Sequence, residues 1–125
     1  MSDAYGPAER TESITTIRAA LDEGVTLIDT DDFYASGLNK MLVVEALNGV
    51  ARERYQLSVK FGGLHHPAGG WGPLDGRPEV LRNYLAYSPR RLDVDHIDFY
   101  RVVGLNKAVP IEDTMGAAAV YLMAD

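Results

Sequence analysis

The sequence has no cysteine among its 125 residues, which excludes disulfide bonds, thiolate metal sites and a cysteine nucleophile. It also has no hydrophobic run long enough to span a bilayer, and its first residues have neither the basic nor the apolar segment of a signal peptide. These absences predict a cytoplasmic protein that does not interact with membranes.

Basic residues are scarce as well. The chain has 12 Lys and Arg residues against 18 Asp and Glu residues, for a formal net charge of −6. Nucleic acids and anionic membranes select basic surfaces, so neither is expected as a partner. With 46% hydrophobic and 24% charged residues, the composition is that of an ordinary globular protein, and residues 1–125 are predicted to form one domain.

Helical and strand patterns alternate along the chain. Helices are expected over residues 7–21, after Asn39 as N-cap to about residue 48, from Pro78 onward, and over residues 110–123. Strands are expected over residues 25–30, 55–60 and 96–103. Strands that alternate with helices form parallel sheets through right-handed crossovers. The pattern therefore predicts an α/β fold with about three parallel strands and four helices.

A glycine-rich segment over residues 61–76 interrupts this alternation. It contains His65, His66 and Trp71 and is too long for a simple turn. We interpret it as a loop that is either functional or mobile.

Three ionisable residues lie at or just beyond strand ends: Asp29, Tyr34 and Lys60. The carboxyl ends of parallel strands are where sites assemble in α/β proteins. Lys60 needs a counter-charge, for which Asp29 in the adjacent strand is the nearest candidate. A neighbouring ammonium would lower the pKa of the Tyr34 phenol and suit it to proton transfer. The residues alone leave open a structural ion pair beside an unrelated surface tyrosine.

Three segments carry a family resemblance: LIDTDDFY at residues 27–34, LSVKFG at 57–62 and VDHIDFY at 94–100. In this order they resemble the aldo-keto reductase family. The resemblance implies a (β/α)8 barrel, of which this chain corresponds to the N-terminal half, and reduction of an aldehyde or ketone with NADPH or NADH. It also implies that Asp29, Tyr34 and Lys60 are catalytic, with Tyr34 as the proton donor and Lys60, held by Asp29, tuning the tyrosine.

The fourth catalytic residue of the resembling family, a histidine, is missing, because its position falls at or next to Val103. Arg101, on the same strand face, is expected either to neutralise Asp29 or to lend a donor to the substrate pocket. Trp71 is expected either to wall that pocket or to anchor the glycine-rich loop. His65 and His66 are predicted to be solvated, and no metal site is expected.

Several further residues depart from the family pattern. Ala35 follows the tyrosine where glycine is common, and Asp93 follows the third helix at a position that favours glycine. Lys40 replaces a glutamate in a first helical turn, where a cation opposes the helix dipole. Asp31 and Asp32 are predicted to be solvated. Together with Pro89 inside the third helical pattern, these departures suggest relaxed constraint.

A complete (β/α)8 barrel takes roughly 250 residues. The resemblance places most cofactor contacts in the half that this sequence does not include. Three alternatives therefore stay open. The chain is expected to be an enzyme completed by a complementing half-barrel chain or a second copy of this one, a non-catalytic interaction module, or a degenerate half-barrel with no activity.

Overall fold

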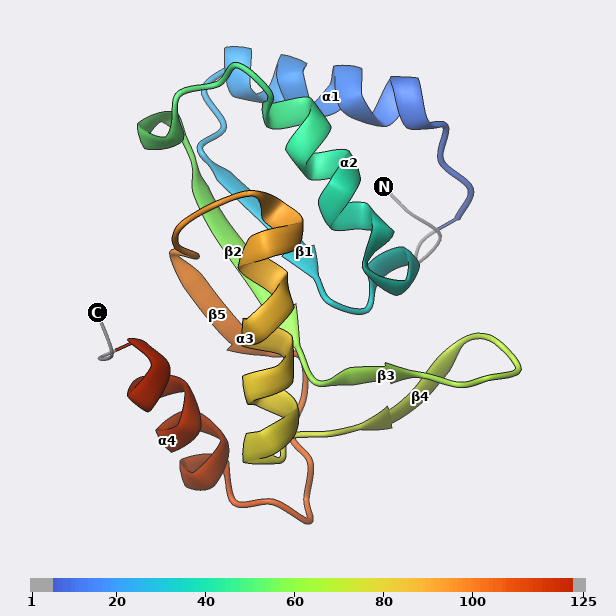
Figure 1. The fold of residues 1–125 in the computed structure, drawn as a ribbon. Coiled ribbons are helices and arrows are strands. Elements are labelled where there is room, and N and C mark those ends of the chain that lie inside the picture. Colours follow the sequence, from blue (N-terminus) through green and yellow to red (C-terminus); the bar gives the residue numbers. More distant parts are fainter. Residues whose placement is uncertain (1–5, 123–125) are drawn as a thin grey trace.

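Three parallel strands form the centre of the protein (Figure 1). A computed structural model describes residues 6–122. The strands of this sheet are β1 (Leu27–Asp31), β2 (Gln56–Phe61) and β5 (Phe99–Val102). The helices are α1 (Arg10–Asp22), α2 (Leu38–Leu47), α3 (Pro78–Leu92) and α4 (Ile111–Leu122), with short 3-10 turns η1 (Tyr34–Gly37) and η2 (Arg52–Arg54).

The sheet has the order β1-β2-β5, and both strand pairs are parallel. Its register pairs Asp29 with Ser58, and Lys60 with both Asp31 and Arg101. The predicted α/β fold with three parallel strands and four helices is confirmed within residues 6–122, whereas position 123 lies outside the described residues. Most helices and strands begin or end within one to three residues of the predicted bounds, which is usual because the ends of such elements fray.

Part of the glycine-rich segment is an ordered hairpin, which corrects its interpretation as a loop throughout. β3 (Gly63–His65) and β4 (Trp71–Leu74) pair antiparallel and project beside the sheet from the carboxyl end of β2 (Figure 1). At the hairpin tip, Gly69 and Gly70 have φ of 94° and 78°. Glycine adopts these angles without strain, which allows the chain to reverse there.

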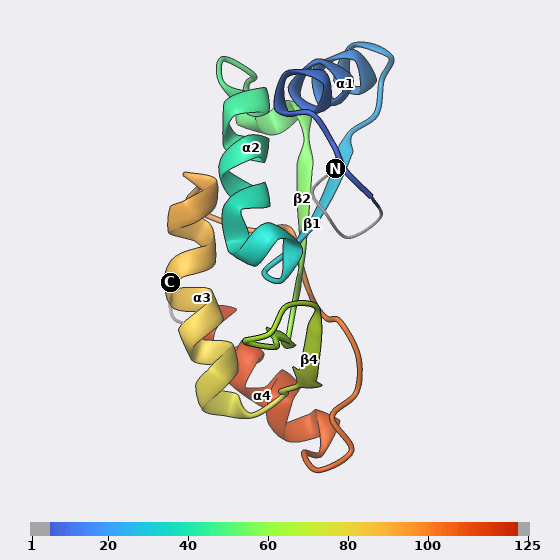
Figure 2. The ribbon, with the colours of Figure 1, turned by 90° about the vertical axis from the view of Figure 1, so that its right-hand side faces the viewer.

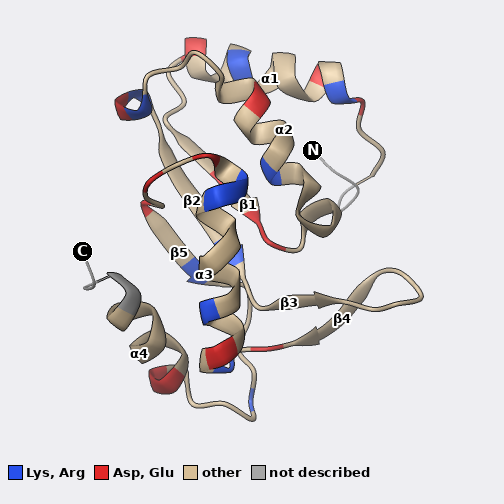
Figure 3. Ribbon diagram, in the orientation of Figure 1, with Lys and Arg blue, Asp and Glu red and all other residues tan. Residues whose placement is uncertain are grey.

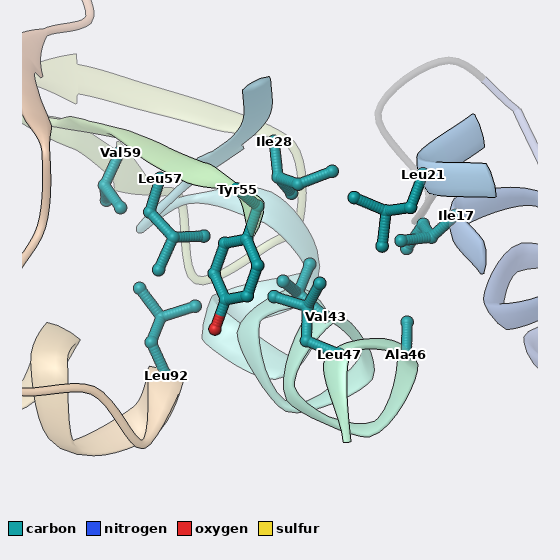
Figure 4. Packing of buried hydrophobic residues seen from close by; sticks show 10 residues of the cluster. All are labelled: Ile17, Leu21, Ile28, Val43, Ala46, Leu47, Tyr55, Leu57, Val59 and Leu92. Carbon is teal, nitrogen blue, oxygen red and sulfur yellow. The ribbon is translucent and has the colours of Figure 1, made fainter. Parts of the chain in front are cut away.

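The main core lies between the sheet and helices α1 and α2, with a contribution from the end of α3 (Figure 4). It is formed by buried aliphatic side chains and one tyrosine: Ile17, Leu21, Ile28, Val43, Ala46, Leu47, Tyr55, Leu57, Val59 and Leu92. Burial of this apolar surface is the dominant favourable term in folding. A second cluster, centred on Phe61 and Leu81, packs α3 against α4.

The two faces of the sheet differ. Seen edge-on, α2 and α3 lie on the same side of it (Figure 2). Strand residues alternate between faces. Ile28 and Val59 point into the core, whereas Leu27 and Phe99 remain 49% and 46% exposed. The face that carries Leu27 and Phe99 is thus open among the described residues.

The start of α2 corrects the prediction for Asn39. The N-cap is Gly37, with φ of 88°, and Asn39 lies inside the helix. Its buried side-chain amide oxygen Oδ1 accepts a hydrogen bond of 2.7 Å from the Thr30 hydroxyl, so Asn39 ties α2 to β1 instead of capping the helix. Asp93, at the position after α3 that favours glycine, is left-handed, with φ of 52°.

Candidate active site

Tyr34 and Lys60 meet where β1 and β2 end. The Lys60 ammonium donates a hydrogen bond of 2.7 Å to the Tyr34 hydroxyl, and its nitrogen lies 3.2 Å from a carboxylate oxygen of Asp29. Tyr34 begins η1 just after β1, and Lys60 points to the same sheet face as Asp29. The structure thus brings together the three residues that the sequence predicted to be catalytic.

Asp29 lies between two cations. Arg101 on β5 donates 2.5 Å from Nη2 to Asp29 and 3.0 Å from Nε to the Ser58 hydroxyl. Partial burial disfavours the charged carboxylate, but hydrogen bonds from Ser58, Arg101 and Lys60 outweigh it and lower the pKa of Asp29. Of the two roles expected for Arg101, neutralising Asp29 is therefore the one seen in these contacts.

Lys60 is held in its charged form. Desolvation would lower its pKa, but hydrogen bonds to Tyr34 and Asp29, with the charge of Asp29, outweigh desolvation and raise it. The Lys60 side chain is 19% exposed and that of Asp29 38%, so the group is accessible from the open face. Basic positions on β2 and β5 lie beside an acidic stretch of β1 (Figure 3), and in the register Lys60 is paired with both Asp31 and Arg101.

A second lysine–aspartate pair lies on the helix side of the sheet and corrects the prediction for Asp32. Lys40 and Asp32 form an ion pair in which both side chains are fully buried. The Asp32 carboxylate also accepts hydrogen bonds of 2.5 Å from Ser88 and 3.2 Å from Tyr100. Asp32 is therefore not solvated, and Lys40, which lies in the first turn of α2 where a cation opposes the helix dipole, neutralises a buried carboxylate. Burial lowers the pKa of Lys40.

Asp31 is buried as well, contrary to the prediction that it is solvated. One carboxylate oxygen accepts a hydrogen bond of 2.9 Å from the Phe33 amide, and the other has no hydrogen-bond partner. Desolvation raises the pKa of Asp31 despite the Phe33 hydrogen bond and the nearby charge of Lys60. Its contact with Phe33 helps to turn the chain from β1 into η1.

The hairpin packs against this turn through aromatic rings. Phe33 stacks on His65 and on Trp71, with ring centroids 3.9 Å apart in each case. Trp71 thereby anchors the hairpin, yet it remains 55% exposed beside the site, so both expected roles for it stay open. His65 is exposed, as predicted, but it also contacts the turn, because its Nε2 lies 2.7 Å from the Phe33 carbonyl oxygen.

Val103 follows β5 directly, and its amide donates 2.8 Å to the Phe61 carbonyl oxygen. Its side chain has no hydrogen-bond donor. His96 lies before β5 and contacts Asp95 at 2.5 Å, away from the site. Ser58 and Phe33 were not among the predicted site residues. Ser58 could have been found, because it lies two residues before Lys60 and strand alternation places both side chains on one face. The stacking of Phe33 could not, because no pattern in the neighbouring sequence predicts it.

The Aldo/keto reductase family matches residues 1–120, and the chain belongs to this family. Among curated proteins it is similar to a probable aldo-keto reductase 1 from Glycine max, with 34% identity over 117 residues that cover 93% of this chain and 34% of the relative. Among solved structures, aldo-keto reductase AKR11C1 from Bacillus halodurans superposes with a TM-score of 0.77 at 31% identity, covering 89% of this chain and 37% of that one.

An aldo/keto reductase from Klebsiella pneumoniae, solved in complex with NADP and acetate, superposes with a TM-score of 0.73 at 26% identity, over 90% of this chain and 36% of that one. The chain therefore spans about a third of the length of the relatives it matches. Its three parallel strands and four helices correspond to part of their barrel.

Within residues 6–122, no helix is long and apolar enough to cross a membrane. The same residues contain no group of three or more His, Asp or Glu side chains placed to hold a metal ion.

Proposed function

We propose that this chain provides the proton-transfer residues of an NADPH- or NADH-dependent reductase that converts an aldehyde or ketone into an alcohol. The observation that carries the proposal is the hydrogen bond of 2.7 Å between Lys60 and the Tyr34 hydroxyl, with Asp29 3.2 Å behind the lysine. Membership of the family supports the same chemistry.

The donor set fits a carbonyl oxygen. Reduction adds a hydride to the carbonyl carbon and a proton to its oxygen, and Tyr34 gives the proton from its hydroxyl. The phenolate left behind is stabilised by the Lys60 ammonium, and Asp29 favours the charged state of Lys60. In the alcohol-oxidising direction the same phenolate accepts the proton.

The described residues fit the cofactor less well than they fit the carbonyl. The cofactor would supply the hydride to a carbonyl carbon at the open face, where Lys60 and Asp29 are partly exposed. However, residues 6–122 have no glycine-rich turn opening a helix of the kind that cradles dinucleotide phosphates. We therefore propose that a further segment or subunit holds the phosphates, either a complementing half-barrel or a second copy of this chain.

Two further residues are proposed to border the substrate. Trp71 presents a half-exposed ring next to the turn that carries Tyr34. Arg101 reaches the same sheet face through Asp29 and Ser58. We propose that Trp71 walls the pocket and that Arg101 helps to set its charge, while no donor replaces the family histidine at Val103.

A direct test is to titrate the purified chain with NADPH by fluorescence, to record its mass in the same buffer, and to assay carbonyl reduction. Tyr34→Phe should lower kcat by at least about a hundredfold and leave cofactor binding unchanged, because a general acid contributes roughly 10² to 10⁴ in rate. Tyr55→Phe is the matched control, because Tyr55 precedes β2 at the opposite end of the sheet. Equal activity in Tyr34→Phe would rule out the proposed proton donor.

The second candidate is a non-catalytic interaction module, which the exposed Leu27 and Phe99 on the open sheet face favour. A stable oligomer that binds neither NADPH nor NADH would support this alternative.

A further inference from the structure

The turn that carries Tyr34 has an unfavourable backbone. After Tyr34, Ala35 and Ser36 adopt left-handed angles (φ 48° and 54°), and Gly37 follows with φ of 88°. Residues with a Cβ atom disfavour this region, because Cβ approaches the following carbonyl oxygen. Two such residues in succession persist only when the surrounding structure holds them.

Phe33, the residue just before Tyr34, is held at its amide, its carbonyl and its ring. Its amide donates 2.9 Å to Asp31, and its carbonyl oxygen accepts 2.7 Å from His65 Nε2 and 3.0 Å from the Ser36 amide. The Ser36 hydroxyl lies 3.4 Å from the same His65 nitrogen. His65 therefore contacts the turn on both sides of Tyr34.

The ring of Phe33 is clamped by the hairpin. The His65 and Trp71 rings lie nearly parallel to it, at 5° and 11°, each with its centroid 3.9 Å away. Two rings at that distance cannot share one face of Phe33, so they lie on opposite faces. His65 and Trp71 are partners across the hairpin, and a Cβ at Gly63 would lie only 3.2 Å from Trp71. The absence of a side chain at Gly63 is what lets the clamp close.

We propose that His65 is a positioning residue for Tyr34: through the Phe33 carbonyl and ring it holds the left-handed turn that places the Tyr34 hydroxyl on Lys60. The inference rests on the proposed function, because it assigns His65 to the same proton-donating site. It also gives the hairpin a role beyond walling a pocket, since displacing the hairpin would displace the proton donor.

The chemistry of the hydrogen bond restricts how this works. A carbonyl oxygen only accepts, so His65 Nε2 carries a proton and the lone pair of the neutral ring is on Nδ1. Protonation of the ring occurs at Nδ1 and leaves the Nε2–H donor in place. His65 should therefore hold the turn in both charge states.

The test follows Tyr34 itself, without cofactor or substrate. The chain is prepared with ring-13C-labelled tyrosine, the Tyr34 resonance is assigned with Tyr34→Phe, and its titration is measured by NMR. In His65→Ala the Tyr34 resonance should shift, and its titration midpoint should rise toward that of ordinary tyrosine as the hydroxyl leaves Lys60. The matched control is His66→Ala, because His66 contacts only the hairpin tip through the Ala68 amide in the described contacts.

Two further variants separate positioning from folding. His65→Leu keeps apolar bulk against Phe33 but has no donor, and should reproduce the shift of His65→Ala. His65→Gln offers an amide donor and should restore part of the wild-type titration. If His65→Ala or His65→Leu is folded by circular dichroism and leaves the Tyr34 titration unchanged, the proposal is overturned, even if hydrogen exchange shows a looser hairpin.

Activity gives an independent reading. In an active preparation, His65→Ala should lower kcat between about tenfold and a hundredfold, as a misplaced reacting group does, and should leave NADPH affinity unchanged. A shifted Tyr34 titration, together with no reductase activity even in an assembly that binds NADPH, would refute the proposed function but not the positioning role. An ordinary midpoint for Tyr34 in the wild-type chain would refute both.

Discussion

Two lysine–aspartate pairs lie near the carboxyl end of the same sheet, on its two sides. Lys60 and Asp29 lie on the open face with their side chains 19% and 38% exposed, and Asp29 has a second cation in Arg101. Lys40 and Asp32 lie between sheet and helices, with both side chains fully buried. The two pairs therefore differ in their surroundings: the buried pair fixes the helices on the sheet, whereas the pair on the open face remains accessible, as the proposed proton transfer requires.

The largest effect should follow from breaking the buried pair. Lys40→Ala leaves the Asp32 charge buried without its counter-ion, which typically costs about 3–5 kcal/mol. We expect a loss of this size in the free energy of unfolding, measured by urea denaturation. The double variant Lys40→Met, Asp32→Asn removes both charges and keeps an acceptor for Ser88 and Tyr100, so it should recover much of the loss. A loss below about 1 kcal/mol in Lys40→Ala would show that water reaches Asp32.

A smaller effect, of opposite sign for two aspartates of β1, should appear in the pH dependence of stability. The folded-state pKa of Asp29 is lowered, so its stabilising contribution is present above about 3.8, its ordinary value, and is lost as the pH falls through the folded pKa. The folded-state pKa of Asp31 is raised, so its contribution is fully present below the ordinary value and is lost as the pH rises through the folded pKa.

Urea denaturation of wild type, Asp29→Asn and Asp31→Asn between pH 3 and pH 7, about the range that spans both groups, checks these signs. As the pH falls, wild type should lose stability relative to Asp29→Asn and gain it relative to Asp31→Asn. The same sign for both variants would contradict the different surroundings of the two carboxylates.

Breaking the accessible pair should affect stability less than chemistry. Lys60→Met leaves Asp29 paired with Arg101, so the free energy of unfolding should fall by less than about 1 kcal/mol. The Tyr34 titration should nevertheless move toward that of ordinary tyrosine, because the neighbouring ammonium is gone. A loss as large as that of Lys40→Ala would mean that both pairs are structural.

The smallest effect is expected for an ion pair in full contact with water. Arg10 on α1 pairs with Glu45 on α2, and their side chains are 60% and 45% exposed. Arg10→Ala should leave the urea midpoint unchanged within error, because exposed pairs contribute little. A clear loss would indicate that this contact fixes α1 on α2.

The order of elements could be predicted from the sequence because each rests on local periodicity. Lys60 and Asp29 were predictable as partners because parallel strands align their carboxyl ends. Lys40 was misjudged because its sequence neighbours say nothing of its partner Asp32, or of Ser88 and Tyr100, which donate hydrogen bonds to Asp32 from other elements. The hairpin clamp on Phe33 was likewise beyond local reasoning, since it depends on residues about 30 positions away.

Arg101 lies far along the chain from its partner Asp29, and this separation affects the order in which contacts form during folding. Tyr34, just after β1, and Lys60, on the adjacent β2, are 26 positions apart, whereas Arg101 and Asp29 are 72 positions apart. Contacts between distant residues carry a greater entropic cost of loop closure and tend to form late. During folding, the tyrosine–lysine contact should therefore precede the second cation, so a chain in which β5 has not yet docked would already hold its proton donor but with Asp29 only half neutralised.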